Sequence, residues 1–199
     1  AAARRKASGG CSLTNCELAF AEGGGNMSIA LTLERYLDER NVKYDVIAHG
    51  PTNSSMQTAK TCHISGDRLA KAVLLRDDIG YVVAVLPASH HIEISELKKQ
   101  FGSDVELATE HEIEELFEDC VRGAIPAVGE CYGLDLLVDD GIEEQPEVYF
   151  EAGDHETLVH MTHAQFACLT AEARHACFST RHLVCARMQG RCRSEMDRP

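Results

Sequence analysis

The apolar segment at residues 69–75, LAKAVLL, constrains the fold of this chain more than any other part of the sequence. Alternate side chains of a β-strand point to opposite faces, so Lys71 falls on the face of Leu69 and Leu75, and Ala70 and Ala72 fall on the other. Both faces are apolar apart from the lysine. We therefore predict a strand that is covered on both sides.

Lys71 is the first candidate for a functional residue. An ammonium group in such a strand loses hydration, which is costly unless it meets a partner or lines a wet cavity. The alternative is that the long side chain extends to the edge of the sheet and serves packing alone.

The rest of the chain alternates between strand-like and helix-like segments. Residues 80–86 form a second apolar strand, joined to the first by a short turn at 77–80. Thr109 with Glu112, and Thr162 with Gln165, are capping boxes that predict helix starts. The predicted helices are 29–40 (capped by Ser28), 54–62, 94–101, 109–118 and 163–170, and the other strands are 44–48, 134–138, 147–151 and 156–161. This pattern predicts an α+β domain with a mixed, partly barrel-like β-sheet surrounded by helices.

Composition and charge divide the chain into three parts. A glycine-rich stretch ends at residue 26, and the sequence after about Cys177 is rich in arginine. We predict a disordered extension at 1–26, one folded domain at 27–177 and a tail at 178–199. The formal net charge of −13 is concentrated in the domain, because both ends are net basic. A domain so acidic argues against non-specific nucleic-acid binding, and no DNA partner is expected.

Other features exclude several classes. No apolar run approaches the roughly 20 residues that a membrane-spanning helix needs, and the N-terminus lacks the apolar core of a secretory signal. The nine cysteines are odd in number and none forms a CxxC pair, so free thiols in a reducing cytoplasm are expected. Cys62-His63 and His90-His91 have no third spaced ligand, so neither a metal nor another cofactor is expected.

Two further segments are candidates for the site. The loop at residues 123–129 reads GAIPAVG, and its glycines permit the close backbone approach that presents N–H groups to a ligand oxygen. His155, in the sequence Gly153-Asp154-His155, has the chemistry of a positioning group or an acid–base. The alternatives are a plain surface connection for the loop and an ordinary surface residue for the histidine.

Taken in order, these motifs match those of a known family. A helix leads to a strand ending in His49-Gly50-Pro51-Thr52, and Thr58 follows in the next helix. The lysine strand, the strand ending VLPASH at 85–90, the GAIPAVG loop and the GDHETLV segment complete the series. From Met27 to about Cys177 the chain resembles the YbaK/prolyl-tRNA synthetase-associated domain family.

The resemblance implies a freestanding, cytoplasmic hydrolase that clears mischarged aminoacyl-tRNA. The substrate would be the ester between a small amino acid and the terminal adenosine of the acceptor end, with an aminoacyl-tRNA synthetase as a possible further partner. Lys71 matches the family lysine most closely tied to activity, and Gly123 begins the family glycine loop. The loop is usually GxxxP. Here Ala127 occupies the fifth position and Pro126 precedes it.

The predicted site therefore has two sets of residues. The catalytic set is Lys71, Gly123 and Gly129, and the substrate-binding set is His49, Thr58, Ala72, Ile125, Pro126 and His155. Aminoacyl esters are already activated, so carbonyl polarisation by N–H donors, a placed water and a cation suffice as chemistry. The alternatives are a non-catalytic module on the same fold that binds a tRNA end or a synthetase, and a small-molecule hydrolase unrelated to tRNA.

Overall fold

A computed structural model describes residues 29–101 and 104–181. The helices are α1 (Leu31–Glu39), α2 (Ser55–Thr61), α3 (Ile94–Phe101), α4 (Glu110–Leu116), the 3-10 helix η1 (Gly129–Tyr132), α5 (Asp140–Glu143) and α6 (His163–Leu169). The strands are β1 (Asp45–Ala48), β2 (Leu69–Arg76), β3 (Tyr81–Pro87), β4 (His90–Ile92), β5 (Glu106–Leu107), β6 (Asp135–Asp139), β7 (Glu147–Glu151), β8 (Thr157–Thr162), β9 (Arg174–Ala176) and β10 (Ser179–Arg181). The predicted α+β class is confirmed.

The central sheet is mixed and open. Its strands follow the order β1-β8-β7-β2-β3-β6-β9, with β5 added beside β2. The β2–β3 pair is antiparallel, as the predicted turn requires, whereas β2–β7 and β3–β6 are parallel. Because β1 and β9 remain at the two ends of this order, the partly barrel-like closure that we predicted is not formed.

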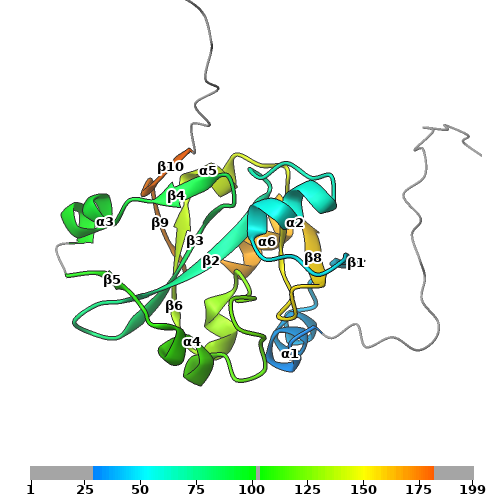
Figure 1. Cartoon of the computed structure of the whole chain (residues 1–199), viewed down its shortest axis with the longest axis horizontal. Coiled ribbons are helices and arrows are strands. Elements are labelled where there is room, and N and C mark those ends of the chain that lie inside the picture. The colour runs from blue at the N-terminus through cyan, green and yellow to red at the C-terminus, as the bar shows by residue number, and fades with distance from the viewer. Residues whose placement is uncertain (1–28, 102–103, 182–199) are drawn as a thin grey trace, which may run out of the picture.

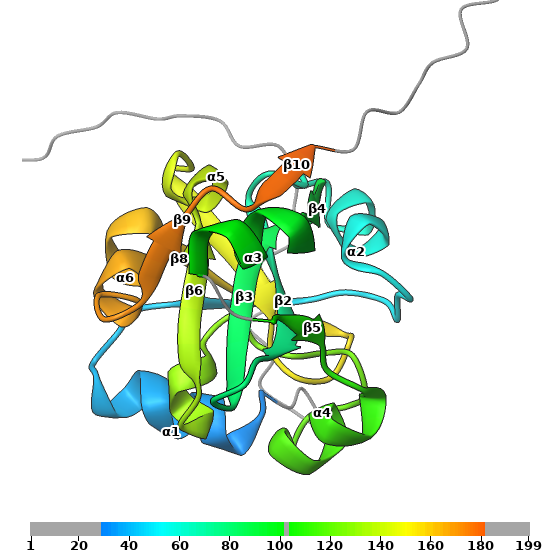
Figure 2. The same cartoon turned by 90° about the vertical axis from the view of Figure 1, so that its left-hand side faces the viewer.

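Both faces of the sheet are covered, as the sequence of the lysine strand predicts. Helices α1 and α6 lie on one side of the strands and α3 on the other (Figures 1 and 2). Ala70 and Leu74 of β2 belong to the cluster packed against α1 and α6. Leu75 packs with Leu97 of α3 on the opposite face. Farther along that second face, Leu69 packs with Ala59 of α2, which completes the cover.

Local capping signals locate the helix starts correctly. Thr109 accepts from the Glu112 amide and the Glu112 side chain accepts from the Thr109 amide, which is the predicted capping box of α4. Thr162 and Gln165 form the same arrangement at α6. The first helix is different. Its N-cap is Ala30, without a side-chain cap, and the predicted cap Ser28 lies outside the described residues.

The ordered fold extends farther at its C-terminal end than we predicted, and it includes a second, two-stranded sheet. The short strands β4 and β10 pair antiparallel with each other, and β10 lies inside the segment that we predicted as a tail. Arg181 of β10 donates to Asp67 over 2.6 Å, an ion pair between this strand and the turn before β2. The ordered fold therefore extends at least to Arg181. Residues 1–28 and 182–199, which contain the rest of the predicted extension and tail, lie outside the described residues.

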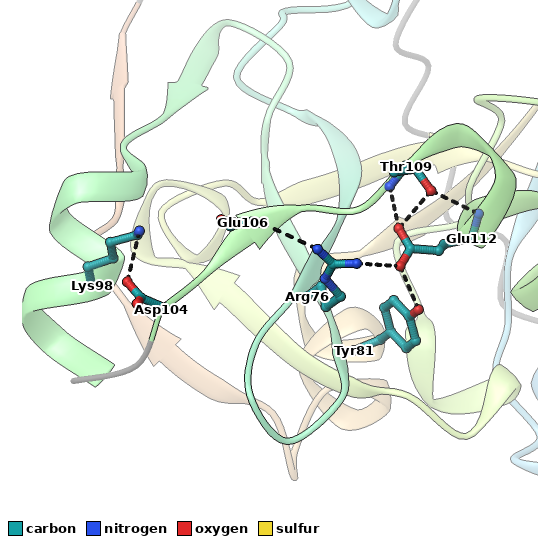
Figure 3. Close-up of polar contacts among 7 residues, drawn as sticks. All are labelled: Arg76, Tyr81, Lys98, Asp104, Glu106, Thr109 and Glu112. Atoms are coloured by element: carbon teal, nitrogen blue, oxygen red, sulfur yellow. Dashed lines mark hydrogen bonds and ion pairs between the residues drawn. The ribbon is translucent and has the colours of Figure 1, made fainter.

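A polar network anchors α4 to the β2–β3 hairpin. The Glu112 carboxylate accepts from Arg76 of β2 over 2.9 Å and from the Tyr81 hydroxyl of β3 over 2.8 Å (Figure 3). The Thr109 amide adds a third bond of 2.7 Å. Glu112 is therefore bonded to three other residues and is not an isolated solvated charge. Because α4 leads into the 123–129 loop, this network also fixes where that loop begins.

Candidate active site

Lys71 lies near the start of β2 and is half-buried. Its ammonium group donates a hydrogen bond of 2.5 Å to the backbone carbonyl of His90, at the first residue of β4. Loss of hydration lowers the pKa of Lys71 below its usual value. The ammonium group is thus held inward by a neutral carbonyl oxygen, and no ion pair neutralises it among the described residues.

A buried carboxylate lies on the neighbouring parallel strand. Leu69 pairs with Tyr149 in the β2–β7 register, and the two side chains pack in one cluster on the same face. Lys71 and Glu151 each follow two residues later, so they emerge on that face as well. Glu151 is only 7% exposed. Burial raises the pKa of this carboxyl group, although His49, His155 and a hydrogen bond from Thr58 oppose the shift.

Helix α2 supplies one hydroxyl group, that of Thr58, to this carboxylate. Thr58 is fully buried, and its hydroxyl lies 3.2 Å from Glu151 Oε1 and 2.6 Å from the Thr52 hydroxyl. Ser54 caps the helix by accepting from the Gln57 amide, which fixes where the first turn begins. The second carboxylate oxygen, Glu151 Oε2, is buried and has no partner in the described part of the chain.

Two predicted histidines flank Glu151. The amide of His49, just after β1, donates to the Glu156 carbonyl over 2.7 Å, while its Nε2 is buried without a partner in the described structure. His155, in the β7–β8 turn, adopts a φ of 62°, which is uncommon for a residue with a side chain. The Asp154 carboxylate accepts from the amides of Glu156 and Thr157 and so holds this turn.

The start of the glycine loop meets His155. His155 Nε2 lies 2.8 Å from the Arg122 carbonyl, and a Cβ at Gly123 would lie 3.5 Å from the same nitrogen. Gly123 has a φ of 86°, so the predicted need for glycine is confirmed at this position. Its N–H has no acceptor among the described residues. By contrast, the Ala124 amide already donates to the Val121 carbonyl over 2.9 Å.

Gly129 has a different role from the one we predicted. It is buried at the start of η1, and a Cβ there would come within 2.6 Å of a Val83 methyl group. Close packing of this turn on β3 therefore requires glycine at position 129. We assign Gly129 to the packing of the loop and not to catalysis.

Two predicted substrate-binding residues, Ala72 and Ile125, belong to the main core on the other face of the sheet, where Ile125 is only 6% exposed. Pro126 is buried as well. Ala72 lies on this face because adjacent residues of the strand β2 point to opposite faces of the sheet. Ala72 and Lys71 are both members of the predicted site. The structure does not place the two side chains together.

The structure brings together Thr58, His49, His155 and the Gly123 end of the loop, with Lys71 on the same sheet face. Glu151 and Thr52 are the residues of this group that sequence reasoning missed. The sequence signal for Glu151 is weaker than that for Lys71, because Glu151 is the last residue of the strand EVYFE. In residues 29–101 and 104–181 no cluster of His, Cys, Asp and Glu is suited to hold a metal ion. In the same ranges none of the helices has the length and apolar character needed to cross a bilayer.

Chemically, this face offers an inward-held ammonium, an unengaged loop N–H and a buried carboxylate, without an activated nucleophile. These groups can bind and polarise a substrate that is already reactive, such as an ester. The Cys120 and Cys131 thiols, elsewhere in the fold, are poor nucleophiles because burial raises their pKa values to about 11 and about 12.

Comparison with known proteins agrees with this description. The model of the aminoacyl-tRNA editing domain family matches residues 49–169, from His49 to the end of α6. The chain therefore belongs to the aminoacyl-tRNA editing domain family. No curated protein sequence matches it.

Solved structures share the fold at low sequence identity. A proposed trans-editing enzyme for prolyl-tRNA synthetase is 20% identical, with a TM-score of 0.66 over 76% of this chain and 96% of that one. The hypothetical protein APE2540 is 22% identical, with a TM-score of 0.67 over 75% and 99%. A proposed signal transduction protein from Marinobacter aquaeolei VT8 is 22% identical, with a TM-score of 0.61, and the match spans 76% of this chain but 31% of that protein.

Proposed function

We propose that this editing domain hydrolyses the ester bond of mischarged aminoacyl-tRNA that carries a small amino acid, as a separate protein in the cytoplasm. The observation that carries the proposal is the position of Lys71. A half-buried ammonium group is held on the sheet face that also carries Glu151, which Thr58 of α2 contacts, and Glu151 leads into the turn where His155 meets Gly123.

The proposed reaction adds water across the ester. The water oxygen bonds to the carbonyl carbon, and the bond to the ribose oxygen breaks. A proton passes to that oxygen, and the products are the free amino acid and a tRNA with an intact terminal hydroxyl. The N–H of Gly123 is placed to polarise the carbonyl. Lys71 holds the oxygen-rich acceptor end, since an ammonium group donates to phosphate or hydroxyl oxygens.

A second function has a specific observation in its favour. The Ala124 amide is already bonded to the Val121 carbonyl, and Ala127 stands where the family loop usually has proline. The loop therefore offers fewer free N–H groups at its start than a dedicated oxyanion site would. The alternative is a non-catalytic module that binds a tRNA end or an aminoacyl-tRNA synthetase.

A deacylation assay separates the two functions. Labelled Ala-, Cys- and Ser-tRNA are incubated with the protein, with Lys71→Ala and with the control Lys99→Ala, which changes an exposed lysine of α3. We expect release of amino acid from at least one substrate, a loss on the order of 10²–10³ in Lys71→Ala, and no change in Lys99→Ala. Release at the spontaneous rate from every substrate would leave only the binding function. Release that survives Lys71→Ala would remove Lys71 from the site.

A further inference from the structure

We propose that Glu151 is the residue that recognises the α-ammonium group of the aminoacyl moiety. The inference rests on the proposed function, because it assumes that the ligand is the aminoacyl-adenosine end of a tRNA. It goes further by naming the residue that binds the unblocked α-amino group of the ester.

The first argument is the half-satisfied state of the carboxylate. Glu151 is 7% exposed, and Oε1 accepts from the Thr58 hydroxyl over 3.2 Å. Oε2 is buried and has no donor among the described residues. A buried carboxylate with an open acceptor position is costly unless a donor or a cation occupies it. An α-ammonium group is both.

The second argument is the lack of an internal cation for this charge. Lys71 shares the sheet face, but its ammonium group donates to the His90 carbonyl and forms no ion pair with Glu151. Arg68, near the start of β2, is paired with Glu147 over 2.5 Å. In the described residues, the electrostatic interactions that most lower the pKa of Glu151 therefore come from His49 and His155. Neither forms a hydrogen bond to its carboxylate.

The third argument is the position of this carboxylate relative to the proposed reaction centre. Glu151 ends β7, two residues before Gly153, and the turn that follows carries His155 to the Gly123 end of the loop. In an aminoacyl ester the α-ammonium group is separated from the carbonyl carbon by one carbon atom. A carboxylate beside the carbonyl site therefore lies where the α-ammonium group of the ester would need a partner. Thr58 of α2, which is itself bonded to the Thr52 hydroxyl, fixes the orientation of the carboxylate.

Binding of a stable substrate analogue tests the inference without requiring turnover. The probe is adenosine with an L-alanylamino group in place of the 3′-hydroxyl, in which an amide replaces the ester. The comparison ligand is the 3′-propionylamino compound, which lacks only the α-amino group. Both are titrated by calorimetry into the wild-type protein, into Glu151→Gln and into Glu156→Gln. Glu156 is exposed, and its carboxylate makes no hydrogen bond or ion pair in the described structure.

We expect the wild-type protein to bind the alanyl compound roughly 10- to 100-fold more tightly than the propionyl compound, the range for a charge-assisted hydrogen bond. Glu151→Gln should reduce this preference to about threefold or less, and Glu156→Gln should retain it. A preference that persists in Glu151→Gln overturns the inference, and so does equal or undetectable binding of both ligands to the wild-type protein. The wild-type comparison does not depend on how any variant folds.

The result is also distinct from a failure of the proposed hydrolysis. Release of no amino acid from any aminoacyl-tRNA, together with a Glu151-dependent preference for the alanyl compound, would remove the hydrolase and keep the recognition. Deacylation without that preference would keep the hydrolase and remove the role of Glu151.

Discussion

Lys71 and Glu151 stand on the same face of the sheet, each two residues beyond the paired Leu69 and Tyr149 of the parallel strands β2 and β7. The two charges do not neutralise each other. The ammonium group donates to the His90 carbonyl, and the carboxylate accepts from Thr58. The half-buried ammonium group and the buried carboxylate are thus each held by a neutral partner. Such a pair suits a ligand that carries both a cation and anionic oxygens. Aminoacyl-tRNA has this character at its acceptor end.

The buried state of Glu151 predicts a gain in stability when the charge is removed. The pKa of Glu151 is raised in the folded state. When the pH rises past the pKa of an unfolded glutamate, the unfolded chain loses its proton before the folded protein does. Folding therefore becomes less favourable as the pH rises. Glu151→Gln should therefore have a higher melting temperature than the wild-type protein at pH 7. The difference should shrink toward pH 4. Thermal unfolding followed across this pH range checks it, and a lower melting temperature for Glu151→Gln at pH 7 would contradict the sign.

Thr58→Val should destabilise the domain by about 1–3 kcal/mol, because it leaves the Thr52 hydroxyl and Glu151 Oε1 without their buried partner. Valine keeps the volume of threonine, so packing loss contributes little. The matched control is Thr58→Ser, which keeps the hydroxyl and loses a methyl group. Urea denaturation of the three proteins measures the free energies of unfolding. A larger loss in Thr58→Ser than in Thr58→Val would show that packing dominates at this position.

The two loop glycines should respond differently to alanine. Gly129→Ala drives a Cβ to within 2.6 Å of Val83 in the core, and overpacking of this kind costs about 1–3 kcal/mol of stability. Gly123 is exposed and has room for a Cβ, with His155 Nε2 3.5 Å away. Its φ of 86° instead penalises the alanine backbone, by about 1–2 kcal/mol.

Activity distinguishes the two positions further. Gly123→Ala should reduce deacylation because the strained backbone shifts the unengaged N–H, whereas the Gly129→Ala protein that remains folded should keep its rate. Single-turnover deacylation at a temperature well below both melting transitions provides the measurement. Equal losses of rate in both variants would mean that the loop acts as one unit, and the separate roles would then be wrong.

The fold could be predicted from the sequence wherever the signal is local. The capping boxes at Thr109 and Thr162 locate helix starts, because side chain and backbone satisfy each other within four residues. The strands β4, β9 and β10 were missed because each has only three residues and depends on a partner distant in sequence. Such strands have no periodic pattern of their own.

The same difference between local signals and long-range contacts applies to the candidate site. Lys71 could be identified from sequence because a charge interrupts an apolar strand, whereas Glu151 is the last residue of β7, where a charge is ordinary. The contact between Thr58 and Glu151 spans 93 residues and could not be predicted from either segment alone. The placement of Ile125 in the main core likewise depends on how the loop enters the core. For Ala72 the alternation of β2 already predicts the face opposite Lys71, and the structure agrees with that alternation.

The Glu112 network predicts an acid-sensitive contribution to stability. Hydrogen bonds from Thr109, Tyr81 and Arg76 lower the pKa of Glu112 to about 2 (Figure 3). A lowered carboxyl pKa stabilises the fold above the unfolded value near 4.5, and this contribution is lost as the pH falls through about 2. Glu112→Gln should therefore melt below the wild-type protein at pH 7, and the two melting temperatures should converge as the pH approaches 2. Glu118→Gln is the control, since Glu118 is exposed and makes no hydrogen bond or ion pair in the described structure. A Glu112→Gln difference that stays constant from pH 7 to pH 2 would show that the network acts through hydrogen bonding alone and not through the charge of Glu112.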